Sequence, residues 1–290
     1  MKEMNSQNVI DTNNVSLMTY HFRLIAVFIL HFSFCTLCNA QVNNALSKKQ
    51  VKERDSLMAV SILNLDSNFI FVEGGAFEMG LPDTSTIEGS EIEKPRHTIN
   101  LKSFYILKTL VTQALWYSVM DSNPSFHKNC FTCPVENVSW NDAETFIKKL
   151  NALKKGHYRL PTEAEYEYAA RGGKKSKGFD YSGSNDENKV AWYANNSKDQ
   201  SHPVGEKKPN ELGLVDMSGD VWEWCSDWFN MYYYKVSPSD NPQGPAQGEK
   251  KVLRGGTWMS LDEGCLVISR GALMPASKDK FTGFRIVRDL

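Results

Sequence analysis

The residues best suited to chemistry lie between Asn210 and Trp228, in the run NELGLVDMSGDVWEWCSDW. Asp216 and Glu223 stand on either side of Gly219, a residue that tolerates a sharp turn or a positive φ. Two carboxylates, together with free carbonyls of an irregular loop, are ligands that a hard cation such as calcium accepts. Alternatively, Asp216 only caps a turn through its side chain and Glu223 is an ordinary strand residue. The spacing is not that of an EF-hand loop.

The cysteines are the second group of reactive side chains. Outside the N-terminal segment there are four, Cys130, Cys133, Cys225 and Cys265. An even number of cysteines in an exported chain favours disulfides. Cys130 and Cys133 are spaced to close a small loop, or to bind a metal if Cys225 and Cys265 came near. The sequence leaves these pairings open, with disulfides the simpler interpretation.

The elements that position these residues can be inferred from the patterns around them. After Gly219 the sequence alternates as a strand, which places Val221, Glu223 and Cys225 on one face and the neighbouring Trp residues on the other. Short strands are also predicted at 251–260 and 282–287. Around Gly74-Gly75, the run FIFVEGGAFEMG predicts a hairpin of two strands, and residues 95–108 predict a second strand pair.

Three helices are predicted from capping residues and apolar spacing. The first covers 113–120 behind Thr112. The second begins near Ser139 or Asn141 and ends at Gly156. The third opens with a capping box formed by Thr162 and Glu165. The glutamates of this third helix are interpreted as structural, not catalytic.

Composition narrows the class of protein. The chain has 290 residues, a net charge of −1, 41% hydrophobic and 23% charged residues. These values are typical of a globular protein, and the lack of a long basic run argues against nucleic-acid binding. Seven Trp and eleven Tyr indicate a loop-rich fold with large aromatic anchors. Residues 68–290 are expected to form one domain, preceded by a linker or short helix over 41–67.

The N-terminus has the features of a targeting segment. Residues 24–38 form an apolar run that comes after Arg23 and ends in Cys38-Asn39-Ala40, as in a secretory signal peptide. We expect residues 1–40 to be a signal, with Met18 as a possible true start, and cleavage after Ala40. The run is shorter than the roughly 20 residues of a transmembrane helix, so no span is expected after cleavage. An uncleaved anchor is the alternative, which would leave an exported protein attached to the membrane instead of free in the periplasm or outside the cell.

Six motifs occur in order along the chain: GGAFEMG, PVENVSWNDA, RLPTEAEYEYAARGG, NELGLVDMSGDVWEWCSDW, RGGTW and GFRIV. With these motifs the sequence resembles the formylglycine-generating enzyme, or sulfatase-modifying factor, family from about residue 68 to 290. The resemblance implies an α+β fold of the C-type-lectin-like kind, with short antiparallel strands, two or three helices, much irregular structure and bound calcium.

Oxidases of this family convert a cysteine in a C-x-P-x-R segment of a sulfatase to formylglycine with oxygen and copper(I), which two cysteine thiolates hold. Soft thiolates suit copper(I). The matching positions here are Ser260 and Cys265, so the first thiol is a hydroxyl. Cys225 is a weak candidate for a replacement thiol. A Cys225–Cys265 disulfide is favoured over that arrangement.

The resemblance also assigns calcium ligands. Asp216 and Glu223 match side-chain ligands, and Gly219 and Val221 match backbone-carbonyl ligands. A second site would involve Asn195, a weaker match because the loop after it differs. The same type of domain also occurs in iron enzymes of the ergothioneine pathway. Iron chemistry is a third choice for this chain, because the H-x-x-x-H-x-E motif of those enzymes is missing from its sequence.

Two functions are consistent with these residues. One is an exported oxidase that modifies a cysteine of a protein or peptide substrate, with Cys265 as the remaining thiol. The other is a non-catalytic, calcium-stabilised module that presents an aromatic-rich groove to a peptide, glycan or protein partner. The pair Ser260 and Cys265 distinguishes the two.

Overall fold

The computed structural model describes residues 48–87, 90–128 and 130–290. The chain divides into two units, residues 1–51 and 52–290, and the second unit contains the sheets and the candidate sites. The predicted signal segment lies outside the described residues. No helix of the described part is long and apolar enough to cross a membrane.

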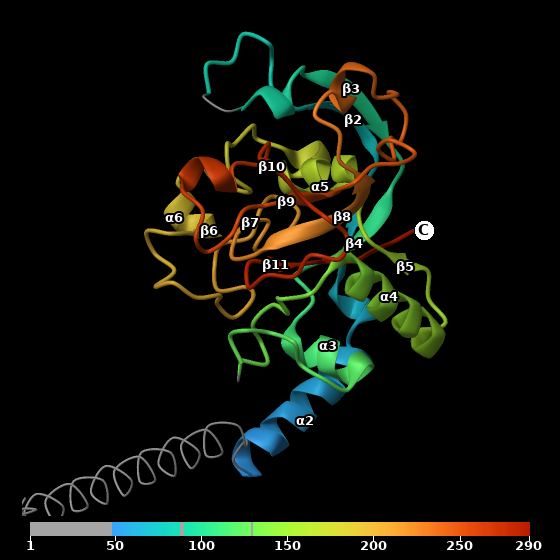
Figure 1. Cartoon of the computed structure of the whole chain (residues 1–290), viewed down its shortest axis with the longest axis vertical. Coiled ribbons are helices and arrows are strands. Elements are labelled where there is room, and N and C mark those ends of the chain that lie inside the picture. Colours follow the sequence, from blue (N-terminus) through green and yellow to red (C-terminus); the bar gives the residue numbers. More distant parts are fainter. Residues whose placement is uncertain (1–47, 88–89, 129) are drawn as a thin grey trace, which may run out of the picture. The chain divides into compact units, whose positions relative to one another are not determined.

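Short elements joined by long irregular segments make up the fold (Figure 1). The α-helices are α2 (Lys48–Leu63), α3 (Gln113–Met120), α4 (Trp140–Lys154), α5 (Glu163–Ala170) and the single turn α6 (Glu187–Val190). The strands are β1 (Phe69–Val72), β2 (Gly75–Met79), β3 (His97–Leu101), β4 (Phe104–Leu107), β5 (Tyr158–Arg159), β6 (Ala191–Trp192), β7 (Ser218–Gly219), β8 (Trp222–Trp228), β9 (Lys251–Arg254), β10 (Arg270–Leu273), β11 (Thr282–Gly283) and β12 (Val287–Arg288).

Two four-stranded sheets organise the domain. One has the order β1-β4-β12-β5 and the other β10-β9-β8-β11, and β2-β3 and β6-β7 form smaller sheets. This mixed, helix-poor architecture is the α+β fold that the sequence predicts.

The three predicted helices form where their capping residues place them. Thr112 accepts a hydrogen bond from the Leu115 N–H at the start of α3. Ser139 and Thr162 each begin a complete capping box, before α4 and α5. Each cap satisfies backbone N–H groups that a helix N-terminus leaves free, which is why the local sequence is sufficient to define these starts.

The predicted hairpin around Gly74-Gly75 is wrong, as is the predicted pairing within 95–108. β1 pairs with β4, and β2 pairs with β3. The segments 69–79 and 97–107 therefore run antiparallel as one bent ribbon. The β1–β4 half of this ribbon belongs to a four-stranded sheet, and the β2–β3 half forms a two-stranded sheet. A Cβ on Gly74 would lie 2.3 Å from the Leu101 oxygen, so glycine is needed where the two arms bend across each other.

The core lies on both sides of β8 and β9. On one face, Trp224 and Leu253 pack with α3 and α4 in a cluster that includes Trp116, Phe146 and Phe284. On the other, α5 covers the sheet with Tyr166 and Tyr168. Glu223 and Cys225 of β8 therefore lie on the side of the sheet that faces α5.

Candidate functional site

The acidic turn before β8, residues 216–220, has positive backbone φ angles that few residues other than glycine adopt. Asp216, Gly219 and Asp220 have φ values of 58°, 77° and 65°. A Cβ at Gly219 would approach the Trp192 oxygen to 2.2 Å. The turn is therefore pressed against β6, and its two aspartates are almost completely buried.

Each aspartate has one oxygen bound and one free. The Gly205 N–H donates to Asp216 Oδ2 at 2.7 Å, and the His202 N–H donates to Asp220 Oδ1 at 3.0 Å. Asp216 Oδ1 and Asp220 Oδ2 are buried without a hydrogen-bond partner in the described structure. Burial raises the pKa of Asp216 to about 6 and that of Asp220 well above its usual range. Two free, buried carboxylate oxygens fit a bound cation or a proton.

Glu223 is used differently from the expected ligand. Its carboxylate is fully buried and binds the Arg285 guanidinium through Nε at 2.6 Å and Nη2 at 2.7 Å. The Tyr166 hydroxyl donates to the same carboxylate at 3.0 Å. Both oxygens of Glu223 are therefore engaged, so this side chain joins β8 to the C-terminal segment and to α5.

The ligand set implied by the resemblance thus fits in part. Asp216 has a free oxygen, whereas Glu223 is held by Arg285. Asn195 is exposed on the loop after β6, close to Tyr193. Within the described residues no group of three or more His, Cys, Asp or Glu is arranged to hold a metal.

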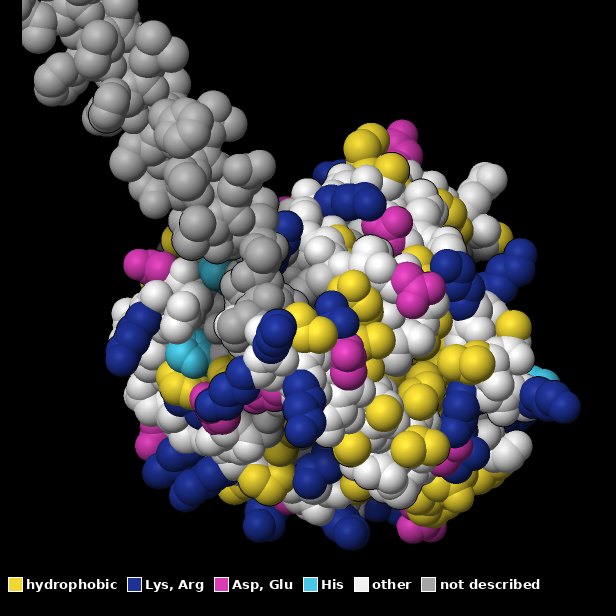
Figure 2. All heavy atoms as spheres, turned by 90° about the horizontal axis from the view of Figure 1, so that it is seen from below, with side chains coloured by type: hydrophobic (Ala, Val, Ile, Leu, Met, Phe, Trp, Pro, Cys, Tyr) yellow, Lys and Arg dark blue, Asp and Glu magenta, His cyan; other side chains and the backbone are white. Residues whose placement is uncertain are grey.

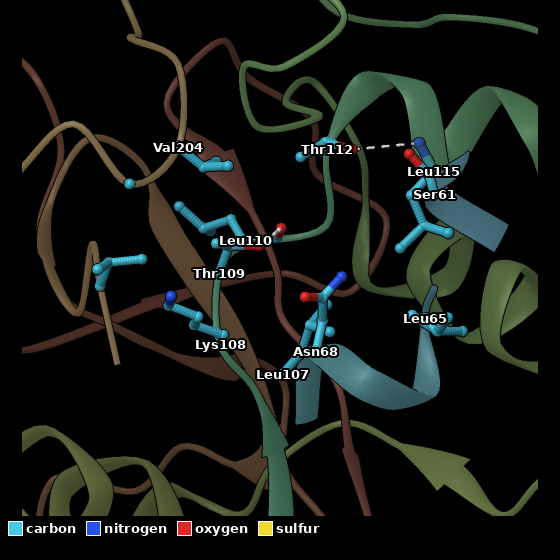
Figure 3. Close-up of a pocket in the computed structure, with 12 residues that line it drawn as sticks. Ser61, Leu65, Asn68, Leu107, Lys108, Thr109, Leu110, Thr112, Leu115 and Val204 are labelled. Carbon is cyan, nitrogen blue, oxygen red and sulfur yellow. Dashed lines mark hydrogen bonds between the residues drawn. The ribbon is translucent and has the colours of Figure 1, made fainter. Parts of the chain in front are cut away.

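A hollow of about 350 Å³ opens beside the acidic turn (Figure 3). It is lined by the segment Leu107–Leu110, by Ser61 and Leu65, and by Val204, Gly205 and Val215. Gly205 is the donor to Asp216, and Val215 precedes Asp216 in the chain. Two lining residues of the hollow are therefore directly connected to Asp216, one by a hydrogen bond and one by the chain.

The structure changes the expected cysteine pairing. Cys130 and Cys133 form a disulfide, whereas Cys225 and Cys265 are both free and buried. Cys225 packs in the core beneath α5, and Cys265 in a separate cluster with Tyr181 and Tyr193. The favoured Cys225–Cys265 disulfide is therefore wrong, because the two thiols belong to different parts of the core.

Ser260 and Cys265 meet at one backbone amide. The Thr257 N–H donates to Ser260 Oγ at 3.0 Å, and the same amide interacts with the Cys265 sulfur. Cys265 is completely buried, and burial raises the pKa of its thiol to about 12. A hydroxyl and a protonated, inaccessible thiol do not form the two-thiolate site that copper(I) requires.

An open groove begins at Ser260. It has a volume of about 370 Å³ and is lined mainly by apolar side chains; we call it the Ser260 groove. Its lining is Trp222, Leu253, Thr257, Met259, Ser260, Gly271, Ala272, Leu273, Asp279 and Phe281. Met259, Leu261 and Met274 are about half exposed or more. On the face of the domain in Figure 2, apolar side chains also gather in patches among Lys and Arg.

Sequence reasoning did not identify Arg285, Asp220 or Asp279 as site residues. Arg285 lies within the GFRIV motif and Asp220 comes directly after Gly219, so the motifs could have identified both. Asp279 and Gly271 lie outside all six motifs, and no sequence pattern indicates a role for them. They join the groove through the packing of β10 and the segment before β11 on β8 and β9.

This fold, with its carboxylate–arginine pairs and its groove beside the Ser260 position, defines a domain of the formylglycine-generating-enzyme type. The chain matches the sulfatase-modifying factor enzyme 1-like domain family over residues 63–290, and it belongs to this family.

Relatives include proteins with different names. The chain is 32% identical over 274 residues to the chaperone protein LppX of Paenibacillus barcinonensis, a match covering 77% of this chain and 90% of LppX. It is 38% identical over 172 residues to the formylglycine-generating enzyme of Streptomyces coelicolor, covering 54% of this chain and 52% of that enzyme. The chain therefore spans about half the length of that enzyme.

The fold matches solved structures over most of the domain. Treponema denticola variable protein 1 superposes with a TM-score of 0.70 at 30% identity, covering 77% of this chain and 95% of that one. This similarity supports the C-type-lectin-like α+β assignment.

Proposed function

We propose that this protein is a non-catalytic binding module of the family, and that the Ser260 groove holds a segment of a partner polypeptide. The observation that carries the proposal is the pair at the Thr257 amide. Ser260 replaces one thiol, and Cys265 is buried with a pKa of about 12. The oxidase site is therefore incomplete, while the apolar groove beside it remains open.

One relative supports a binding role. The match to the chaperone protein LppX covers 90% of LppX and 77% of this chain, and chaperones bind polypeptides. We extend the proposal to an exported location. The apolar N-terminal segment and the Cys130–Cys133 disulfide support it, because disulfides persist in oxidising compartments.

Calcium is a second part of the proposal. Asp216, with its free oxygen, would supply a side-chain ligand beside the carbonyls of Gly219 and Val221. When bound, the cation would neutralise the buried carboxylate. Glu223 would not be a direct ligand, because both of its oxygens are bound by Arg285 and Tyr166.

Groove binding can be tested with an unfolded polypeptide as the probe. Reduced, carboxamidomethylated lactalbumin with a fluorescent label would be titrated with the protein, and the anisotropy recorded. Gly271 has no positive φ, and a Cβ there would meet Leu253 and Trp222 at ordinary contact distances. Gly271→Val should therefore fold, fill the groove and weaken binding at least tenfold.

Ala152→Val, on the exposed side of α4, is the matched control and should bind like the unmodified protein. Thermal melting of all three proteins checks that the fold is intact. Equal binding by Gly271→Val and the unmodified protein would show that the groove is not the site, and no binding by either would refute the proposed function.

A further inference from the structure

We infer that the occupant of the Ser260 groove is an extended segment that adds to β10 as a further strand and places a lysine or arginine beside Asp279. This inference rests on the proposed function and specifies the partner's chemistry. Three features carry it: the open edge of β10 at Ala272, the apolar floor, and the Asp279 carboxylate that lines the groove.

β10 forms an edge of its sheet (Figure 1). The Arg270 N–H points away from β9, because it donates to Glu93 Oε1 at 3.1 Å. In antiparallel pairs the backbone groups of successive residues alternate in direction. Ala272 therefore also directs its N–H and C=O away from β9, and neither has a partner among the described residues. An added strand would satisfy both groups.

The floor of the groove is one face of the sheet. Gly271 stands opposite Leu253 in the β10–β9 register. Because Gly271 lacks a side chain, the edge of the Trp222 ring lies 3.7 Å from where its Cβ would be. Leu273 extends the same face. This arrangement leaves an apolar depression next to the free edge, suited to every second side chain of an extended segment.

Asp279 is the charged residue that lines the groove. Its Oδ1 accepts a hydrogen bond from the Phe281 N–H at 3.0 Å, and its carboxylate forms no ion pair among the described residues. Lys278 is paired with Asp142, and Lys280 stacks near Trp258 and Phe281. A partner with a positive side chain therefore complements the Asp279 carboxylate better than an acidic partner does.

Three labelled heptapeptides would test the inference by fluorescence anisotropy. The first is Lys-Val-Thr-Val-Thr-Val-Lys, the second has Glu at both ends, and the third is the first with its five internal amides N-methylated. We expect the lysine peptide to bind at least tenfold more tightly than either of the others. N-methylation removes the N–H donors that an added strand needs, and a Glu end placed beside Asp279 is repelled by its carboxylate.

A variant of Asp279 tests whether this residue causes the preference for lysine over glutamate. Asp279→Asn should reduce the preference for Lys over Glu severalfold, whereas Glu53→Gln, an exposed carboxylate on α2, should leave it unchanged. Equal binding of all three peptides, or an unchanged preference in Asp279→Asn, would overturn the inference while groove binding of unfolded lactalbumin still stood. Binding of lactalbumin without any peptide binding would also overturn it. Failure of both probes would instead refute the proposed function.

Discussion

At the residue scale, the chemistry of the site depends on which polar atoms are paired. Ser260 and Cys265 share one amide donor, and the Cys265 thiol is buried. Glu223 is matched by Arg285, whereas Asp216 and Asp220 each keep an unpaired oxygen in the described structure. The sequence could identify Ser260 and Cys265 as the altered pair from the family motif. It could not show that Arg285 neutralises Glu223, because 62 residues separate them and only the folded packing brings them together.

Asp227 offers a test of buried charge by pH. Burial raises its pKa to about 7 from a usual value of 3.8. The protonated carboxyl stabilises the fold at pH values below 3.8, the pKa of the unfolded chain. This contribution is lost as the pH rises from 3.8 through the folded-state pKa of about 7. Asp227→Asn should therefore match the unmodified protein near pH 4 and exceed its unfolding free energy at pH 8 by on the order of 2–4 kcal/mol.

Urea unfolding at several pH values would measure this effect. The Asp227 carboxylate accepts hydrogen bonds from the Glu163 N–H and the Ser226 hydroxyl, and an asparagine oxygen can accept both. A variant that is less stable than the unmodified protein at pH 8 would show that the ionised carboxylate is needed.

At the element scale, α5 is held to the sheet by buried ion pairs. Glu163 binds Arg270 of β10, and Glu167 binds Arg254 of β9 at 2.5 Å. The capping box of Thr162 could be read from the sequence, and so could the helix. The pairing of β1 with β4 could not, because a glycine pair predicts a local turn and gives no information about a ribbon that bends at that point.

Removing one partner of such a pair should be costly. Glu167 also accepts hydrogen bonds from the Gly80 N–H and from Arg171. Glu167→Ala therefore removes the nearest counter-ion of buried Arg254, whose other acidic partner, Glu163, lies 3.9 Å from its Nε. We expect a loss of about 3–5 kcal/mol in unfolding free energy. Chemical denaturation measures it, with the exposed Glu53→Ala as the control, for which the change should stay within about 0.5 kcal/mol. A loss below about 1 kcal/mol for Glu167→Ala would contradict the role assigned to this pair.

At the scale of the whole molecule, much of the fold is irregular and its stability depends on contacts between distant segments. The motifs predicted the family and the α+β class, because six ordered matches are specific. They could not predict the separation of Cys225 from Cys265, which depends on α5 and the loop before β10 packing into different core clusters. The proposed calcium site belongs to this scale, since the acidic turn joins β6, the loop at Gly205 and β8.

Calcium should stabilise the whole domain if it binds at Asp216. A ligand that binds only the folded state raises the melting temperature, so millimolar calcium should raise it by several degrees. Asp216→Asn should abolish this increase, and Glu53→Gln should retain it. An equal increase in Asp216→Asn, measured by differential scanning fluorimetry, would place the ion elsewhere.

The proposal of a binding module without oxidase activity is tested most directly by mass spectrometry. The purified protein from Gln41 to Leu290 would be reduced, supplied with copper(I) and incubated in air with a C-x-P-x-R peptide, alongside a Ser260→Cys variant. We predict that the unmodified protein leaves the peptide cysteine intact, because Ser260 supplies no thiolate and Cys265 is buried. Conversion of that cysteine to formylglycine by the unmodified protein would contradict the proposal.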